Sequence, residues 1–280
     1  MRTSALSARA LLSARLVRSV VATFALAVLC AACTSTSRQI PANETPDRIT
    51  ASDEPDVQKR ARARMELASA YFGRGQMTTA LDQVKLALAA DPLYGEAFNL
   101  RGLIYANLGE HALAEESFKR ALQINPRDAD AMHNYGWYLC QQKRYPDAYA
   151  MFGQALAIPQ YRGAARTLLA QGVCQAYAGQ LEDAEASLSR AYELDPLSPF
   201  AATNLAEVLY RRGEYQRARF YVRRVNAQHD VSNAQTLWLA ARIEAKLGNH
   251  QGATEFGTQL RNRFPESREA SAFARGAFDE

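Results

Sequence analysis

Residue types that commonly catalyse reactions or bind metals are few in this chain of 280 residues, and they are widely spaced. No two histidines have the His-x-x-x-His spacing that places two metal ligands on one helix face. The phosphate-binding Walker sequence and the nucleophile elbow of hydrolases are also absent. We therefore predict a protein that is not an enzyme and has no catalytic residues, metal site or cofactor; a site assembled from distant residues stays open. The histidines are His111, His133, His229 and His250.

Cys33 is the first residue with a predicted chemical role, as a site of lipid attachment. It follows a basic start and an uncharged apolar run, Val20 to Ala32. A helix of these 13 residues spans about 20 Å, less than the ~30 Å hydrocarbon core of a bilayer, so we predict a signal peptide over residues 1–32. The small residues before Cys33 resemble a bacterial lipobox, although Cys30 stands where that motif usually has leucine. The resemblance implies cleavage before Cys33 and its acylation; an ordinary signal peptide ending in Ala-x-Ala is the alternative.

The excess of positive charge lies in this leader. The whole sequence has 33 lysines and arginines against 29 acidic residues, and residues 1–32 hold four of the arginines and no acid. Without those four arginines the basic and acidic residues balance at 29 each. We therefore predict no nucleic-acid partner.

The residues that follow the cysteine indicate a location and a linker. By resemblance to Gram-negative lipoproteins, a residue other than aspartate after the cysteine, here Thr34, implies the outer membrane. The protein would then be lipid-anchored and face the periplasm. Residues 33–56 are rich in Ser, Thr, Pro and Asp and have almost no large apolar side chains. Such a segment cannot bury enough surface to offset the entropy of ordering it, so we predict a flexible tether.

The rest of the chain repeats one pattern. An alanine recurs at intervals of 34, 34, 36, 34 and 35 residues. A glycine precedes each alanine by five residues except in the third unit, where Lys143 stands in its place. A small residue precedes each alanine by twelve residues, and a proline closes four of the units. The alanines are Ala80, Ala114, Ala148, Ala184, Ala218 and Ala253.

This pattern predicts a pair of antiparallel helices in each unit. Apolar residues recur at helical spacing on both sides of the glycine, as at Phe98 and Tyr105 before it and at Phe118 after it. The glycine suits the left-handed backbone that ends the first helix, and the small residues allow the two helices to approach closely. Residues 159–164 break the period, so we predict a longer joint there between the third and fourth units.

The units resemble the tetratricopeptide repeat, above all in the segment AEESFKRALQINP at 114–126. The resemblance implies an all-α solenoid, a right-handed superhelix of about six helix-turn-helix repeats in which each pair covers the apolar face of the next. We expect this domain to cover residues 57–280, with residues 268–280 as a C-terminal cap. The expected repeats are 61–94, 95–128, 129–164, 165–198, 199–233 and 234–267.

Cys140 and Cys174 occupy matching places, late in the first helices of the third and fourth repeats. First helices of neighbouring repeats pack side by side, and thiols outside the cytoplasm become oxidised. We therefore predict a disulfide, which the chain-entropy model credits with about 3–4 kcal/mol of stabilisation. The alternative is two buried free thiols that pack as small apolar side chains.

Tetratricopeptide geometry implies an inner face lined by the first helix of each pair. In this chain that face mixes aromatic and amide side chains, a composition that suits a protein or peptide partner. For each single residue, packing in the core is the alternative to contact with a partner. The predicted partner-binding groove contains Asn99, Leu103, Asn107, His133, Trp137, Gln141, Leu169 and Tyr177.

The segment AMHNYGWYLCQQKRYPDAYAMF at 131–152 carries a narrower resemblance, to the PilF/PilW family, above all in its NYGW and LC stretches. Members of that family are outer-membrane lipoproteins of type IV pilus biogenesis. The resemblance implies a non-catalytic pilotin role: binding the secretin subunit, and promoting its outer-membrane localisation and its multimerisation.

Two other functional classes stay open on the sequence. One is a general tetratricopeptide lipoprotein adaptor in outer-membrane or cell-envelope assembly that has no connection with pili. The other is an enzyme such as a peptidoglycan hydrolase, against which the missing catalytic cluster speaks.

Overall fold

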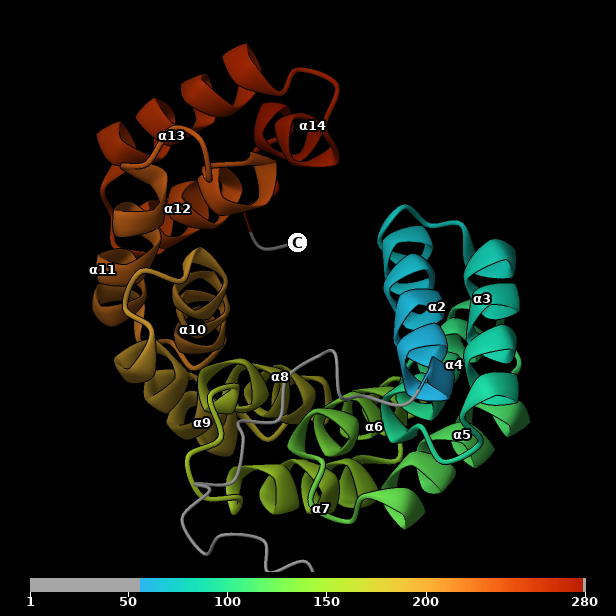
Figure 1. The fold of residues 1–280 in the computed structure, drawn as a ribbon. Helices are drawn as coiled ribbons and strands as arrows, with labels where there is room; N and C mark the ends of the chain where they lie inside the picture. The colour runs from blue at the N-terminus through green and yellow to red at the C-terminus, as the bar shows by residue number, and fades with distance from the viewer. Residues whose placement is uncertain (1–55, 279–280) are drawn as a thin grey trace, which may run out of the picture. The chain divides into compact units, whose positions relative to one another are not determined.

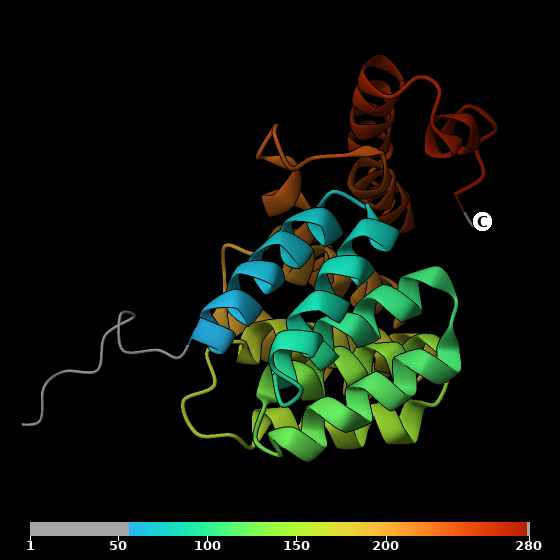
Figure 2. The same ribbon diagram turned by 45° about the vertical axis from the view of Figure 1, so that its right-hand side comes forward.

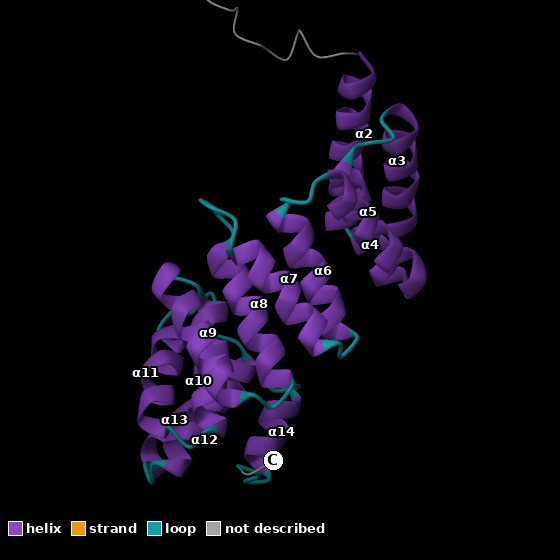
Figure 3. Ribbon diagram, turned by 90° about the horizontal axis from the view of Figure 1, so that it is seen from below, coloured by secondary structure: helices purple, strands orange, loops and turns teal. Residues whose placement is uncertain are grey.

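The computed structural model describes residues 56–278, and the regular elements within that range are all α-helices (Figures 1 and 3). The predicted signal peptide, Cys33 and the predicted tether up to residue 55 lie outside the described residues. Within the described range, no helix is both long and apolar enough to cross a bilayer. The helices are α2 (Asp56–Gly73), α3 (Met77–Ala90), α4 (Gly95–Leu108), α5 (His111–Ile124), α6 (Ala129–Gln141), α7 (Tyr145–Leu156), α8 (Ala164–Tyr177), α9 (Leu181–Leu194), α10 (Pro199–Arg211), α11 (Tyr215–Asn226), α12 (Ala234–Lys246), α13 (His250–Arg263) and α14 (Arg268–Ala274).

The helices from α2 to α13 form consecutive pairs, and each pair packs against the next one along the chain (Figures 1 and 2). The short helix α14 packs against α12 and α13 of the last pair. This is the all-α solenoid of helix-turn-helix repeats that the sequence predicts.

Small residues bring the two helices of a pair together. At Gly102 of α4, an added β-carbon would lie 2.7 Å from the ring of Phe118 in α5. At Gly136 of α6, it would lie 2.9 Å from the ring of Phe152 in α7. A larger side chain at either position would force the second helix outward, so the small-residue column sets the spacing within a pair. The alanine column is buried as well, at Ala80, Ala114, Ala148, Ala184, Ala218 and Ala253.

The first helices lie on the inner side of the array. Each first helix from α2 to α10 contacts the first helix of the next pair. Among the described residues, the backbones of neighbouring second helices lie farther apart, and these helices contact each other through long side chains, as at Tyr192 of α9 and Tyr221 of α11, whose ring centroids are 5.1 Å apart. Because first helices approach one another more closely than second helices do, the array curves with its first helices on the concave side.

A residue with left-handed backbone follows the first helix in each of the six pairs. The glycines at these turns have φ between 72° and 80°, which confirms the predicted role of the glycine column. Lys143 adopts φ 58°, and its backbone N–H donates to the carbonyl of Cys140 at 2.9 Å. The third pair therefore makes the same turn with a side chain that strains it by about 1 kcal/mol. The glycines are Gly75, Gly109, Gly179, Gly213 and Gly248.

The joint between the third and fourth pairs is longer than three of the others and as long as residues 227–233 between the fifth and sixth pairs. It spans residues 157–163, whereas the joint between α3 and α4 spans residues 91–94. Gln160 within it has φ 60°, another left-handed residue with a side chain. The irregularity predicted for residues 159–164 is therefore confirmed.

A buried carboxylate links the fifth and sixth pairs. Glu244 of α12 is 1% exposed, and its oxygens accept hydrogen bonds from Arg219 and Arg223 of α11 at 2.9 and 2.7 Å. Asn249 donates to the same carboxylate at 2.7 Å. Burial raises the pKa of Glu244, but the hydrogen bonds from Asn249, Arg223 and Arg219 outweigh burial and leave the pKa below its usual value. The charged form is therefore the one that the fold stabilises.

Replacing Lys143 by glycine should stabilise the protein. Lys143→Gly relieves the left-handed strain, and after subtraction of the extra entropy of an unfolded glycine we expect a gain of about 0.5–1 kcal/mol. Lys143→Ala keeps the β-carbon and should leave stability unchanged. Gly109→Ala, where no atom lies near the added carbon, should lose about 1 kcal/mol. Urea unfolding of the three variants measures these differences, and a Lys143→Gly variant less stable than the starting protein would contradict the strain.

Removing the charge of Glu244 should weaken the protein most at neutral pH. Because the folded pKa lies below the unfolded one, the charged carboxylate contributes stability above the unfolded pKa, and this contribution is lost as the pH falls through the folded pKa. Glu244→Gln should cost about 1–3 kcal/mol at pH 7 and less near pH 3. Unfolding measured across this pH range tests the effect. Glu193→Gln, at an exposed ion pair with Arg190, is the control and should change little. A pH-independent loss at Glu244 would refute the role of its charge.

Candidate partner-binding groove

A hollow of about 500 Å³ lies between the first helices of the first three repeats. Asn99 and Leu103 of α4 line it together with Met65 of α2. Asp130 of α6 and Tyr161 of the long joint complete its other side. Two of the predicted groove residues, Asn99 and Leu103, are thus brought together in one cavity that has both apolar and polar walls.

A pair of amide side chains crosses from α4 to α6 beside this hollow. The side-chain N–H of Asn134 donates to the side-chain oxygen of Asn99 at 3.2 Å. Each amide has one carbonyl oxygen and one NH₂ group, so this bond leaves the oxygen of Asn134 and the NH₂ of Asn99 to bind other groups. An extended polypeptide offers N–H and C=O groups that match this pair. Both side chains are half-buried, which limits the entropy they lose when a partner binds.

His133 lies in the core rather than on the surface of the groove. The residue is 8% exposed, and its Nδ1 lies 3.0 Å from the hydroxyl of Thr167, which is fully buried in α8. Burial and, to a smaller extent, the charge of Arg166 lower the pKa of His133 to about 4, so the ring is neutral at pH 7. The structure therefore assigns His133 to the contact between α6 and α8, and not to a surface that a partner can reach.

A polar network fixes the long joint at the edge of the hollow. The hydroxyl of Tyr161 donates to the carboxylate of Asp130 at 3.1 Å, and Arg166 donates to the same carboxylate at 2.6 Å. The hydroxyl of Tyr161 also lies 3.2 Å from that of Thr167. These contacts tie the joint to the start of α6 and of α8, so Tyr161 forms a defined wall of the hollow.

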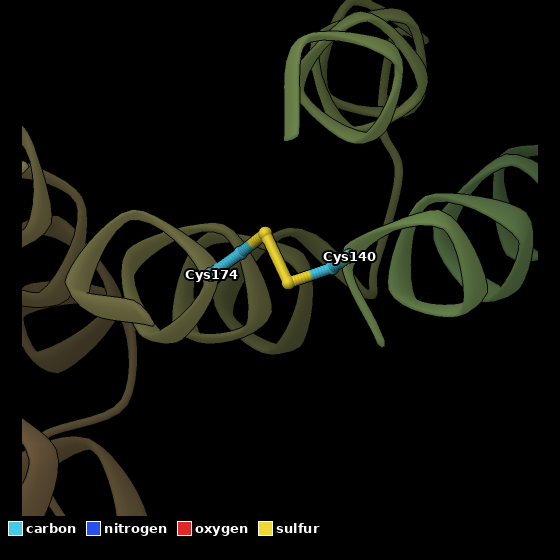
Figure 4. The surroundings of a disulfide bond; sticks show 2 residues. All are labelled: Cys140 and Cys174. Carbon is cyan, nitrogen blue, oxygen red and sulfur yellow. A yellow bond between two sulfur atoms is a disulfide. The ribbon is translucent and has the colours of Figure 1, made fainter. Parts of the chain in front are cut away.

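Trp137 lies next to a cross-link between the third and fourth repeats. Its half-buried side chain packs against the cluster that contains Cys140 and Cys174. In the structure these cysteines form a disulfide that joins α6 to α8, with Cα atoms 5.9 Å apart (Figure 4). Both cysteines are at most 2% exposed. The cross-link therefore ties together the two first helices that carry Trp137 and the fourth-repeat part of the predicted groove.

The other predicted groove residues do not share the hollow. Asn107 donates its side-chain N–H to the carbonyl of Leu103 at 2.9 Å, so its amide serves its own helix. Gln141 is exposed at the end of α6, and Leu169 packs against the core of the fourth and fifth repeats. Tyr177 is 68% exposed. Among the predicted residues it offers a large open aromatic surface, one repeat beyond Trp137.

Asn134, Asp130 and Tyr161 belong to this site but are not predicted from the sequence. Asn134 stands one position after His133, so a shift of one residue in the assumed inner face would have found it. Asp130 and Tyr161 contact each other across the joint. The broken period at residues 159–164 signalled an unusual joint, but no local pattern shows which side chain it would place at the groove.

The side chains of the site have the composition of a surface that suits a polypeptide. It combines apolar area at Leu103 and Trp137 with hydrogen-bonding groups at Asn99 and Asn134. Among the described residues, no group of three or more histidine, cysteine, aspartate or glutamate side chains could hold a metal ion.

Comparisons with known proteins identify the repeats and a relative of most of the chain. Three segments, residues 95–128, 117–150 and 176–243, match family models described as tetratricopeptide repeat. The type IV pilus assembly protein PilF of Pseudomonas aeruginosa is 28% identical over 250 residues, which are 89% of this chain and 95% of that protein.

Two solved structures are similar over most of the domain. One is the crystal structure of PilW, described as a widely conserved type IV pilus biogenesis factor. It is 33% identical, with a TM-score of 0.71, and the match covers 76% of this chain and 98% of that one. The structure of Pseudomonas aeruginosa pilF is 27% identical, with a TM-score of 0.70, and the match covers 79% of this chain and 100% of that one.

The cross-link between Cys140 and Cys174 can be tested in solution. In the mature protein, unfolded without a reducing agent, neither cysteine should react with a thiol reagent, and both should react after reduction. Replacing both by alanine should lower stability by about 2–4 kcal/mol, because a loop of 34 residues is no longer closed in the unfolded chain. Reaction of both thiols before reduction would show that the native protein has no such bond.

Proposed function

The chain belongs to the PilF/PilW family of tetratricopeptide-repeat proteins of type IV pilus biogenesis, and from this premise we propose that it acts as a pilotin. It binds the secretin subunit of the pilus machine, promotes its localisation to the outer membrane and promotes its multimerisation. The protein does this by binding alone, without catalysis. Acylated Cys33 anchors it in the outer membrane, and residues 33–55 let the repeat domain reach its partner in the periplasm.

The observation that carries this proposal is the hollow at the first three repeats. Its apolar wall at Met65 and Leu103 favours an apolar side chain of the partner, because burial of apolar area stabilises the complex. The amide pair of Asn99 and Asn134 lies beside that wall and can bond the partner's main chain. The combination suits an extended segment with apolar side chains, which is the form of secretin contact that we propose.

The contacts around the hollow support binding because they fix its shape in advance. The disulfide and the bonds of Asp130 with Tyr161 and Arg166 hold α6, α8 and the long joint together. A preformed site loses less conformational entropy on binding than a mobile one. We therefore propose that the third repeat and its joint are the rigid part of the binding surface.

Removing the amide pair should weaken secretin binding. Asn99→Ala together with Asn134→Ala deletes two groups that can each form a hydrogen bond worth about 1 kcal/mol, so we expect about tenfold weaker binding or more. Binding of purified secretin to the purified domain measures this. The matched control is Asn204→Ala in the fifth repeat, where the amide donates to the carbonyl of Phe200 in its own helix at 2.8 Å.

The outcomes separate the parts of the proposal. Unchanged binding by a folded Asn99→Ala, Asn134→Ala variant would move the contact away from the hollow. If secretin does not bind even the unaltered protein, and native envelope yields another partner by mass, the pilotin role is wrong and a general adaptor of envelope assembly replaces it. Incorporation of labelled palmitate that persists in Cys33→Ser would contradict the anchor.

A further inference from the structure

The chain carries a second peptide-like contact at the other end of the inner face. After α14 the backbone reverses at Gly276, which has φ 67°, and Ala277 donates its N–H to the carbonyl of Ala272 at 3.0 Å. The ring of Phe278 then stacks on Trp238 of α12, with ring centroids 5.3 Å apart. The C-terminal segment 276–278 therefore lies against the first helix of the sixth repeat.

The first helices of both final repeats approach the main chain of this segment. The carbonyl of Phe278 lies 3.5 Å from the hydroxyl of Tyr210 in α10 and 3.4 Å from Nε of Arg242 in α12. The guanidinium of Arg242 lies 4.5 Å from the centre of the Tyr210 ring, which keeps both donors together. Both distances are at the long end for hydrogen bonds, so these contacts hold the segment weakly.

A hollow with two arginines in its wall lies beside Trp238. This hollow of about 530 Å³ lies between α12 and α14, with Trp238 as one wall. Arg268 and Arg275 also line it, with one acidic side chain, Glu269. The cationic side chains on this end thus outnumber the acidic one. In the sequence, Phe278 is followed by two acidic residues, Asp279 and Glu280.

We propose that the inner face of the fifth and sixth repeats is a second peptide-binding site, and that Ala277–Phe278 of the chain itself occupies it in the structure. The site takes an extended segment with an aromatic residue followed by acidic residues. Trp238 stacks on the aromatic ring, Tyr210 and Arg242 bind the main-chain carbonyl, and Arg268 and Arg275 attract the acidic side chains. This site is separate from the hollow of the first three repeats and does not depend on the identity of the secretin as partner.

Because Ala277–Phe278 occupies the second site, a partner must compete with this segment for binding. A tethered segment has an effective concentration that reaches the millimolar range for short flexible connections, so a free peptide binds weakly until the segment is displaced or altered. Weak main-chain contacts make that displacement possible. A partner segment with the same chemistry and additional contacts in the 530 Å³ hollow would replace the chain's own residues.

The test uses the full chain and a peptide with the sequence RGAFDE of residues 275–280. The chain has two tryptophans, so Trp137→Phe leaves Trp238 as the only tryptophan whose fluorescence reports binding. In that background, Phe278→Ala empties the aromatic position. We expect this variant to bind the peptide at least about tenfold more tightly than the chain that keeps Phe278. A peptide with alanine in place of phenylalanine should not bind, and one with Asn-Gln in place of Asp-Glu should bind more weakly.

Control variants separate a binding site from a structural cap. Phe220→Ala, at a 59% exposed phenylalanine of α11, should leave peptide binding unchanged. Adding Arg242→Gln to Phe278→Ala should weaken peptide binding again, because the guanidinium that donates a hydrogen bond to the main-chain carbonyl is lost. If Phe278→Ala does not fold, Phe278→Leu keeps an apolar side chain and replaces it in the test. Failure of both variants to fold, or equal peptide binding with and without Phe278, would overturn the proposal and leave Phe278 as a core residue.

Discussion

Each helix pair in this protein has an apolar face that only the next pair can cover, and the rest of the structure follows from this dependence. Glycines such as Gly102 bring the second helix close to the first, and the backbones of neighbouring first helices then approach one another more closely than those of second helices. The first helices therefore line a continuous inner surface. The surface available to a partner is a consequence of how the core is built, and no separate element is needed to make it.

The third repeat departs from the regular pattern, and other interactions replace the regular ones there. Lys143 makes the turn that glycine makes elsewhere, and the joint to the fourth repeat is longer than those after the first, second and fourth repeats. The disulfide between Cys140 and Cys174 and the bonds of Asp130 hold this junction instead. The same junction carries Trp137 and one wall of the open hollow. The irregular junction and the hollow thus occur at one place. Tyr161 can form a wall of the hollow because the joint is long enough to place it there.

In the described part of the chain, α14 and residues 276–278 cover the sixth repeat in place of another helix pair. Phe273 of α14 packs where Gly257 leaves room, and Phe278 stacks on Trp238. Among residues 56–278, no segment fills the hollow at the first three repeats, whereas residues 276–278 lie against the first helices of the last two. A cap and a peptide ligand need the same contacts from a helix, an apolar surface and donors for the main chain. The difference between them is only how strongly the segment is held.

The sequence by itself determined the repeat unit, the helix pairs and the turns, because a period of about 34 residues, a left-handed glycine and small residues at close contacts are local features that one stretch of chain displays. Only the tertiary structure decided which inner-face side chains remain open. His133 has the helical spacing of a groove residue, yet Thr167 and the neighbouring helix α8 bury it, whereas Asn134, one position later, reaches Asn99 beside the hollow. Burial depends on side chains that come from helices more than 30 residues away, and no local pattern contains that information.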